Sequence, residues 1–237
     1  MMRRIPILLF AALLALSARA QVGEHRSDLA IGVTGGITMN TVSFNPSVAQ
    51  TMKISPMFGV AVRYNCEKYF TALCGLQMEI DYCNLGWKQN FKDSKTPDYH
   101  YKRDMHYIQI PIMARMAWGR ERKGLMGFIM AGPQIGFVLG EKEDMSPELA
   151  LESELLPTSR KAQYGKACEK KFDYGITAGA GMEVNLAKAG HITLDARYTL
   201  SLADIFNNTK ADYFGRSANS TITIKVTYLF DVLRTKK

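Results

Sequence analysis

Hydrophobic and polar residues alternate with a period of two along most of the chain between Leu29 and Phe230. Residues 192–200 and 222–228 show the alternation most clearly. Because successive side chains of a β-strand point to opposite faces, each such run has one apolar and one polar face. The pattern predicts eight strands, at about residues 28–40, 53–65, 71–87, 104–118, 124–139, 172–186, 190–202 and 219–230.

The connections between these predicted strands alternate strictly between short and long. Short connections cover residues 66–70, 119–123 and 187–189, and the other four are long: 41–52, 88–103, 140–171 and 203–218. Outer-membrane barrels combine short periplasmic turns with longer outside loops. Residue period and loop length together predict an all-β fold, an eight-stranded antiparallel up-and-down transmembrane β-barrel with both termini in the periplasm.

The amino terminus has the features of a cleaved signal peptide. A basic start with Arg3 and Arg4 precedes an apolar core, and the residues up to Ala20 fit a small-residue cleavage site. The apolar stretch is shorter than the roughly 20 residues that a membrane-spanning helix needs. We therefore expect a signal peptide over residues 1–20, cleavage after Ala20, and an outer-membrane barrel domain over residues 21–237.

The polar face of the predicted strands separates a membrane barrel from a soluble one. Apolar residues take the even positions in six strands and the odd positions in the first strand, while the other face is rich in Gly, Ala and Thr. A soluble barrel of lipocalin type would turn its apolar face inward and this face to water. Small residues suit a crowded lumen better, and aromatic residues at the ends of the apolar runs resemble membrane-interface girdles: Tyr64, Tyr82, Trp87, Trp118, Tyr174, Tyr198, Tyr228 and Phe230.

Charged residues on the same polar face point to a network inside the barrel. Eight strands leave a lumen just wide enough for side chains to fill. Unpaired buried charges are costly, so we expect them to pair with one another. The expected lumen ion-pair network comprises Arg63, Glu79, Asp81, Arg115, Asp173, Glu183, Asp195, Arg197 and Lys225.

Net charge and cysteine spacing limit the binding partners and the cofactors that the chain is expected to have. The formal net charge of +8 falls to +5 without the signal-peptide residues Arg3, Arg4 and Arg19, which suits outer-membrane lipid and lipopolysaccharide phosphates. No nucleic-acid motif is present. Cys66, Cys74, Cys83 and Cys168 include no C-x-x-C spacing, and we expect no metal or other cofactor.

An oxidising compartment allows disulfides, but the sequence leaves the pairing of the cysteines open. Cys66 and Cys74 flank a tight turn with the same parity, so a cross-hairpin bond is conceivable. Two small apolar residues near the membrane boundary are an equal alternative. The partners of Cys83 and Cys168 are not assigned.

Sequence signals for an enzyme are poor. The chain has neither G-x-S-x-G nor H-E-x-x-H. His100 and His106 lie near Ser94, Asp98 and Asp104, which would be the components of an outer-leaflet hydrolase. Geometry and not proximity in sequence defines a catalytic triad, so we expect a protein that is not an enzyme.

The connection over residues 140–171 is the strongest candidate for binding. An acidic stretch with interleaved leucines precedes a basic one, and residues 147–156 start like a helix with Pro147 in its first turn. A loop of this length is usually either functional or disordered. One interpretation is a solvated surface loop. The other is a partner-docking loop with candidate residues Glu148, Leu151, Leu155, Leu156, Arg160 and Lys161.

Four segments resemble motifs of the PorT family of outer-membrane barrels from Bacteroidota. Residues 107–112 resemble that family's aromatic-x-x-Ile-Pro-Leu motif, and residues 131–139 its A-G-P-x-x-G segment. Residues 173–183 and 194–198 resemble its sixth and seventh strands. Pro111 removes a ladder hydrogen bond and is expected to mark a bulge.

The resemblance implies an eight-stranded, non-enzymatic outer-membrane barrel. The named member of the family is required for the type IX route of protein export across the outer membrane, so the resemblance implies a role in that secretion, with other secretion components as partners. The alternative is a structural or adhesive barrel that binds surface ligands or links envelope layers. One departure from the usual barrel pattern is that seven residues follow the aromatic Phe230, which elsewhere ends the chain.

Overall fold

The structure of the protein is a computed structural model that describes residues 24–91, 99–121, 123–186, 189–210 and 212–234. The predicted signal peptide over residues 1–20 lies outside the described residues. No helix among the described residues is long and apolar enough to cross a membrane.

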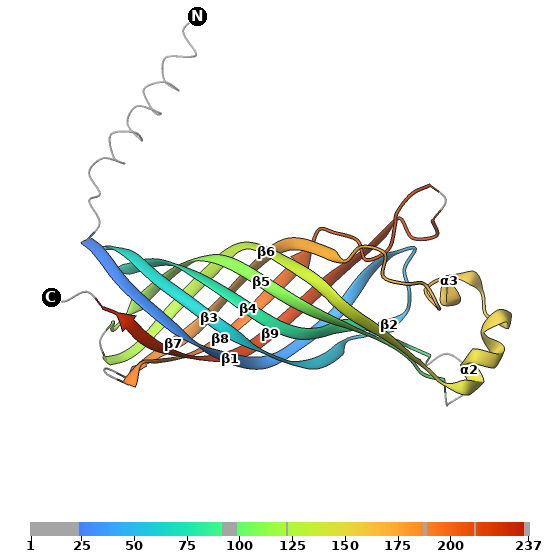
Figure 1. The fold of residues 1–237 in the computed structure, drawn as a ribbon, viewed down its shortest axis with the longest axis horizontal. Coiled ribbons are helices and arrows are strands. Elements are labelled where there is room, and N and C mark those ends of the chain that lie inside the picture. Colours follow the sequence, from blue (N-terminus) through green and yellow to red (C-terminus); the bar gives the residue numbers. More distant parts are fainter. Residues whose placement is uncertain (1–23, 92–98, 122, 187–188, 211, 235–237) are drawn as a thin grey trace, which may run out of the picture.

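Eight long antiparallel strands form a closed ring, which confirms the predicted fold class (Figure 1). Each strand pairs with its neighbours in sequence, and β1 closes the ring by pairing with β9. A short additional strand, β2 (Gln50–Thr51), pairs with the end of β4. The long strands are β1 (Glu24–Asn45), β3 (Lys53–Tyr69), β4 (Ala72–Gln89), β5 (Tyr101–Gly119), β6 (Lys123–Met145), β7 (Phe172–Leu186), β8 (His191–Ser201) and β9 (Arg216–Leu233).

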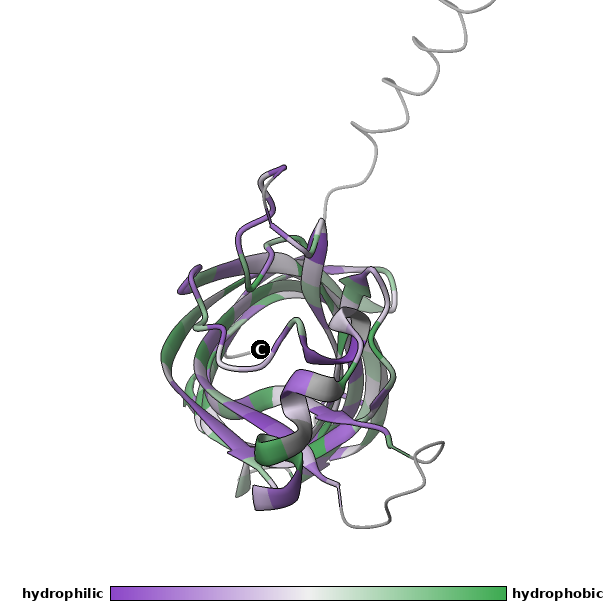
Figure 2. Cartoon of the chain, turned by 90° about the vertical axis from the view of Figure 1, so that its right-hand side faces the viewer, coloured by the Kyte–Doolittle hydropathy of each residue, from purple (hydrophilic) through white to green (hydrophobic). Residues whose placement is uncertain are grey.

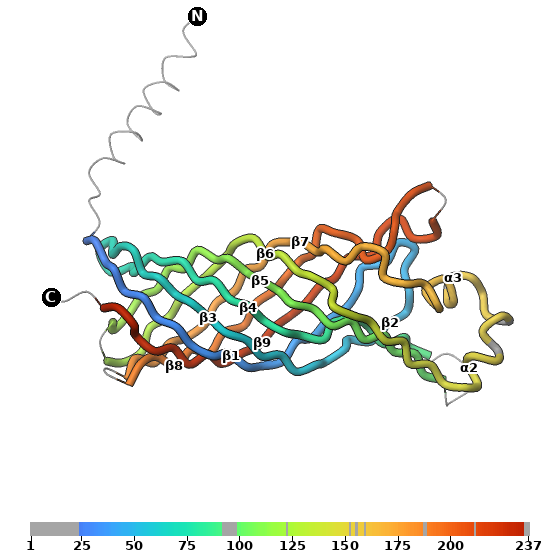
Figure 3. The backbone as a smooth tube through the Cα atoms, in the orientation of Figure 1, coloured from blue at the N-terminus to red at the C-terminus, as the bar shows by residue number. Residues whose placement is uncertain are grey.

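The two ends of the barrel differ, as the alternating loop lengths predicted. The tilted strands run between an end with the short turns, where β1 begins and β9 ends, and an end with the long connections (Figure 3). We call these the turn end and the loop end. The connection from β6 to β7 at the loop end contains α2 (Pro147–Glu152), η1 (Ser153–Leu155) and α3 (Thr158–Lys161). Pro147 occupies the first turn of α2, as expected.

Alternation places apolar side chains outside and polar ones inside. Val33, Phe58 and Ile176 are largely exposed on the outer wall, whereas Thr34, Gln77 and Thr177 are buried inside. The face of β6, which the sequence pattern does not assign, turns its odd positions outward and buries Met126, Phe128 and Met130 in the lumen. The lumen is therefore part apolar, with those three residues packed against Leu73, Met113 and Ala117.

Two local predictions are wrong. Trp87 is not an interface aromatic, because its odd position in β4 turns the indole inward, where it is fully buried. Pro111 does not mark a bulge, because it stands opposite Gln134 in an unshifted register. The irregularity of β5 lies instead between His106 and Tyr107.

Candidate functional site

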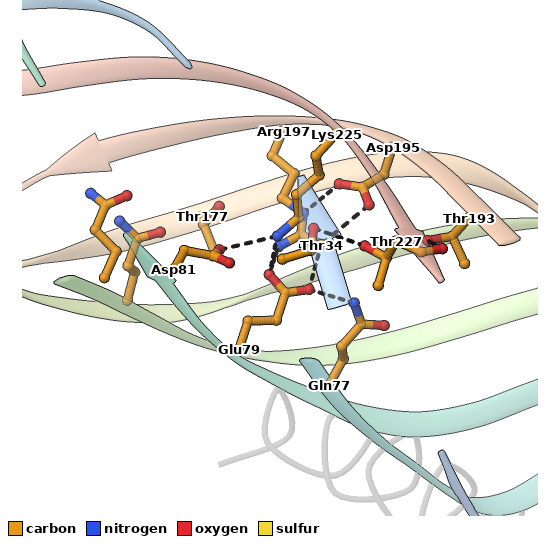
Figure 4. A network of polar contacts seen from close by, with 12 residues as sticks. Thr34, Gln77, Glu79, Asp81, Thr177, Thr193, Asp195, Arg197, Lys225 and Thr227 are labelled. Carbon is orange, nitrogen blue, oxygen red and sulfur yellow. Dashed lines mark hydrogen bonds and ion pairs between the residues drawn. The ribbon is translucent and has the colours of Figure 1, made fainter. Parts of the chain in front are cut away.

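The middle of the lumen holds an ion-pair cluster built from β4, β8 and β9 (Figure 4). Glu79 accepts two hydrogen bonds from Arg197, at 2.7 and 2.9 Å, and also pairs with Lys225. Arg197 further contacts Asp195 at 2.6 Å, and Lys225 reaches Asp81 at 3.1 Å. All five side chains are buried. Three carboxylates thus share two cations, and the Gln77 amide donates a further hydrogen bond to Glu79 at 2.6 Å.

A second cluster lies nearer the turn end and centres on Glu183 of β7. Arg63 contacts its carboxylate at 2.6 Å, and Arg115 binds the same oxygen. His191 approaches the other oxygen at 2.9 Å and reaches Asp231 at 2.7 Å through its second ring nitrogen. The Arg115 guanidinium also stacks over the Phe128 ring at 4.2 Å. Glu183 therefore anchors two guanidinium groups and an imidazole from three other strands, β3, β5 and β8.

The structure brings eight of the nine predicted lumen residues into these two clusters. Asp173, the ninth, is buried nearer the loop end and accepts a hydrogen bond from Ser201 at 2.9 Å. Lys53 and His191 also line the lumen, at odd positions of their strands, and the sequence analysis missed both. The same parity rule would have found them.

A small cavity of about 50 Å³ next to the second cluster leaves space for a few water molecules. Its lining includes Arg26, Arg63 and Asn65, each of which has a buried polar atom without a protein partner. Water in this cavity would satisfy those atoms. Paired charges and bulky side chains otherwise occupy the lumen, so the arrangement suits a rigid barrel better than a path for solutes.

A hydrophobic core closes the barrel near the loop end. We call it the mouth core, and it joins strand residues to loop residues: Val42, Phe44, Val48, Met57, Cys83, Leu85, Trp87, Tyr101, Met105, Tyr107, Leu149, Cys168, Ile205, Phe206 and Phe214. Phe44 packs edge-on against Trp87 with 5.1 Å between ring centroids, and against Phe214 at 4.9 Å. Leu149 of α2 is fully buried in this core, so the helical connection is anchored to the barrel.

The same connection lies over the open end of the barrel in the end-on view (Figure 2), and hydrogen bonds to β4 and β5 hold it there. Gln89 donates to the Arg160 carbonyl at 3.1 Å and accepts from Gln163 at 2.9 Å and from Tyr164 at 2.7 Å. Burial raises the pKa of Tyr164 to about 12, so its hydroxyl remains a donor over the physiological range. Arg103 pairs with Glu141 and donates to the Lys166 carbonyl at 2.5 Å. The connection is thus an ordered cap.

Some of the predicted docking residues are exposed at the surface, and others attach the connection to the barrel. Glu148 is exposed on α2, and Leu151 is 85% exposed. Leu156 is partly buried against the mouth core, and Lys161 donates to the Glu154 carbonyl at 2.9 Å. Arg160 is partly buried, and its carbonyl accepts the Gln89 bond. The Leu155 side chain lies outside the described residues.

Among the described residues, the histidines considered for catalysis have other partners than the members of a triad. The His106 ring meets the Tyr82 hydroxyl at 2.8 Å, and exposed His100 lies 3.8 Å from Asp144. Asp104 is instead paired with Lys53 at 2.6 Å and Lys102 at 2.7 Å. Ser94 and Asp98 lie outside the described residues. Among the side chains that the structure describes, no group of His, Cys, Asp and Glu has an arrangement that could hold a metal ion.

All four cysteines are free thiols in the structure. Cys66 and Cys74 are neighbours across the β3–β4 hairpin, where the Cys66 thiol donates to the Cys74 carbonyl at 3.4 Å. Cys168 is buried in the mouth core, where desolvation raises its pKa to about 11.

With this geometry described, comparison with known proteins defines the class. Residues 19–207 match the family described as "Outer membrane protein beta-barrel domain", and the chain belongs to that family. The protein is therefore an outer-membrane β-barrel. No curated protein matches the chain.

Solved structures share its fold at low sequence identity. OprG of Pseudomonas aeruginosa is 13% identical with a TM-score of 0.50, over 88% of this chain and 98% of that one. Ail, the attachment invasion locus protein of Yersinia pestis, is 14% identical with a TM-score of 0.38, over 87% and 99%. The outer membrane enzyme PagL is 9% identical with a TM-score of 0.40, over 84% and 98%. The similarity to OprG supports the fold alone.

Proposed function

We propose that this barrel is a non-enzymatic component that assists protein secretion across the outer membrane, as the resemblance to the PorT family implies. In this proposal the loop end faces the outside, and the turn end with both termini faces the periplasm after cleavage of the signal peptide. The capped connection between β6 and β7 docks another secretion component. The route is the type IX pathway.

One observation carries the proposal: the barrel is closed inside, yet it presents an ordered connection with an exposed leucine. The ion-pair clusters and the mouth core leave little space for transport of a solute. Buried Leu149 holds α2 in place and the Gln89 hydrogen bonds hold α3 and the residues after it, while Leu151 projects from α2, 85% exposed. An immobilised apolar side chain binds at lower entropic cost than a mobile one.

Deletion of the gene tests the secretion role directly. We expect type IX cargo to accumulate in the periplasm while unrelated barrels still assemble, measured by fractionation and immunoblotting of both. Normal export in the deletion strain would overturn the proposal.

Two point variants then test the docking surface. Leu151→Glu places a charge on the exposed leucine, whereas Phe70→Glu makes the same change at a residue of the turn end that is 84% exposed. Neither side chain supports the fold, so both variants should give the mobility of a folded barrel on unheated gels. We expect Leu151→Glu to reduce export at least several-fold and Phe70→Glu to leave it unchanged. The reverse result would place the docking surface at the turn end.

A structural or adhesive role is the second candidate, and the same exposed surface supports it. Glu148 and Leu151 lie three residues apart on α2 and are both exposed, which suits a ligand at the cell surface as well as a secretion partner. Unchanged export combined with loss of surface binding in Leu151→Glu cells would favour this role.

A further inference from the structure

A groove on the outer wall at the loop end combines lysines with apolar residues and has no part in the proposed secretion role. Its volume is about 570 Å³, and its lining includes Lys170, Lys171, Phe172, Tyr174, Leu202 and Asn208. We call it the rim groove. It lies where the connection from β6 enters β7 and where β8 ends.

Backbone hydrogen bonds fix the two sides of the rim groove to each other. The Leu202 amide donates to the Tyr174 carbonyl at 2.8 Å, and the Lys170 amide donates to the Ile205 carbonyl at 3.2 Å. Phe172 packs against Phe137 with 5.4 Å between ring centroids, and it stacks on Tyr174 at 6.2 Å. The groove is therefore part of the ordered barrel wall.

The rim groove is divided along the barrel axis into an apolar part and a cationic part. Phe172, Tyr174 and Leu202 are each about half exposed on the outer wall, which continues into exposed Ile176 towards the membrane. Lys170 and Lys171 stand at the loop-end side of these residues. Aromatic residues at such a boundary lie at the level of lipid headgroups.

The two lysines keep their charge available. The Lys171 ammonium makes no ion pair or hydrogen bond with the residues that the structure describes, and Lys170 has a 3.4 Å contact with the neutral Asn208 amide oxygen. Lys166, by contrast, is neutralised by Asp212 at 3.4 Å and Glu169 at 3.8 Å.

The acidic groups near the rim groove are already engaged. One Asp204 oxygen accepts the Ser217 amide at 2.7 Å, and the other accepts Asn208 at 3.0 Å. Glu141, which lines an adjoining hollow with Lys171, binds Arg103 and the Cys168 amide. Asp204 also lines the groove, so two lysines stand against one hydrogen-bonded carboxylate, and the groove keeps a net positive charge above an apolar surface.

We propose that the rim groove binds a phosphorylated glycolipid of the outer leaflet, with its phosphate at Lys170 and Lys171 and an acyl chain along Phe172, Tyr174 and Leu202. The inference rests on the proposed orientation, with the loop end outside, but not on the secretion role. A soluble phosphate would leave the apolar part of the groove unused. Basic clusters at the membrane surface bind anionic headgroups through the same charge attraction.

The test measures lipid binding by the full-length barrel reconstituted in phosphatidylcholine nanodiscs. The probe is purified bis-phosphorylated lipid A, titrated against the wild type and the double variant Lys170→Gln/Lys171→Gln. The matched control is Lys161→Gln, whose ammonium lies in α3 and donates to a backbone carbonyl. Two surface cations contribute enough that their loss should weaken lipid A binding by about 30-fold, with the control unchanged.

Several outcomes would overturn the proposal. Equal weakening in the control would indicate attraction to overall charge. Phosphatidylglycerol binding as tightly as lipid A, with the same sensitivity to the variants, would assign the groove to simple anionic phospholipids. Displacement of lipid A by millimolar inorganic phosphate would indicate a soluble ligand, and retained binding in Leu202→Ser would exclude the apolar contact.

A second measurement needs no variant. Lipid A should protect Lys170 and Lys171 of the wild-type barrel from an amine-reactive label, read by peptide mass spectrometry, while Lys161 stays reactive. Unprotected lysines at saturating lipid A would contradict the proposal even if a variant failed to fold. A membrane-impermeant amine label on whole cells checks the orientation separately from any export defect, because it reaches Lys171 only if the loop end is outside.

Discussion

At the scale of single residues, the lumen is stabilised by charges that cannot be removed one at a time. Glu183 pairs with both Arg63 and Arg115 and also contacts His191, all of them buried. Removing one partner of a buried ion pair leaves the others without compensation, whereas an exposed carboxylate contributes little.

Glu183→Gln is therefore expected to lower the free energy of unfolding by about 3–5 kcal/mol. Glu154→Gln, at an exposed residue of the cap, serves as control and should change it by less than about 0.5 kcal/mol. Urea unfolding of the barrel in lipid vesicles, followed by tryptophan fluorescence, measures both. Equal stability of the two variants would show that the Glu183 cluster is not a stabilising anchor.

The reactivity of the Cys168 thiol reports how well the mouth core is closed at the loop end. Burial raises its pKa to about 11, so at pH 8 the thiol is protonated and shielded, and it should resist maleimide in the folded barrel. Labelling should appear only near pH 11 or after unfolding, whereas partly exposed Cys66 should react or be found oxidised. Peptide mass spectrometry distinguishes these thiols, and rapid labelling of Cys168 at pH 8 would show that the mouth core opens readily.

At the scale of elements, the strands could be predicted from the sequence and the cap only in part. Period-two alternation identifies strands because it depends on local geometry. The same parity would also have predicted that Trp87, at an odd position of β4, faces the lumen. The anchoring of α2 depends on contacts with distant strands. Nothing in the sequence separates Leu149, which is fully buried, from Leu151, which is 85% exposed two residues later. The lumen residues follow parity, but their division into two clusters depends on register across the ring.

Leu149→Ala should loosen the connection between β6 and β7 without opening the barrel. Truncation of a buried leucine lowers stability by about 2–5 kcal/mol. Here that loss would weaken the packing of α2 against the barrel. We expect faster hydrogen exchange at the Ala150 amide, which bonds to the Ser146 carbonyl at 3.0 Å, and an unchanged rate in Leu151→Ala. Identical exchange in the two variants would show that Leu149 does not anchor the helix.

At the scale of the whole molecule, two seals act in series: the charged clusters in the lumen and the mouth core above them. A barrel of this construction should carry no steady ionic current. Planar-bilayer recordings of protein that shows folded mobility on unheated gels are expected to stay at the baseline of protein-free membranes. Stable conductance steps would mean that the seals rearrange in lipid.

The pairing of β1 with β9 means that the barrel can close only when the last strand is present. One edge of β1 has no partner until β9 is in place, since residues 29–45 bond to residues 216–233. Lipid offers no hydrogen bonds to such an edge. A chain cut short before residue 216 would lack β9 and would be an open sheet and not a smaller barrel, so truncating alleles should behave as complete losses.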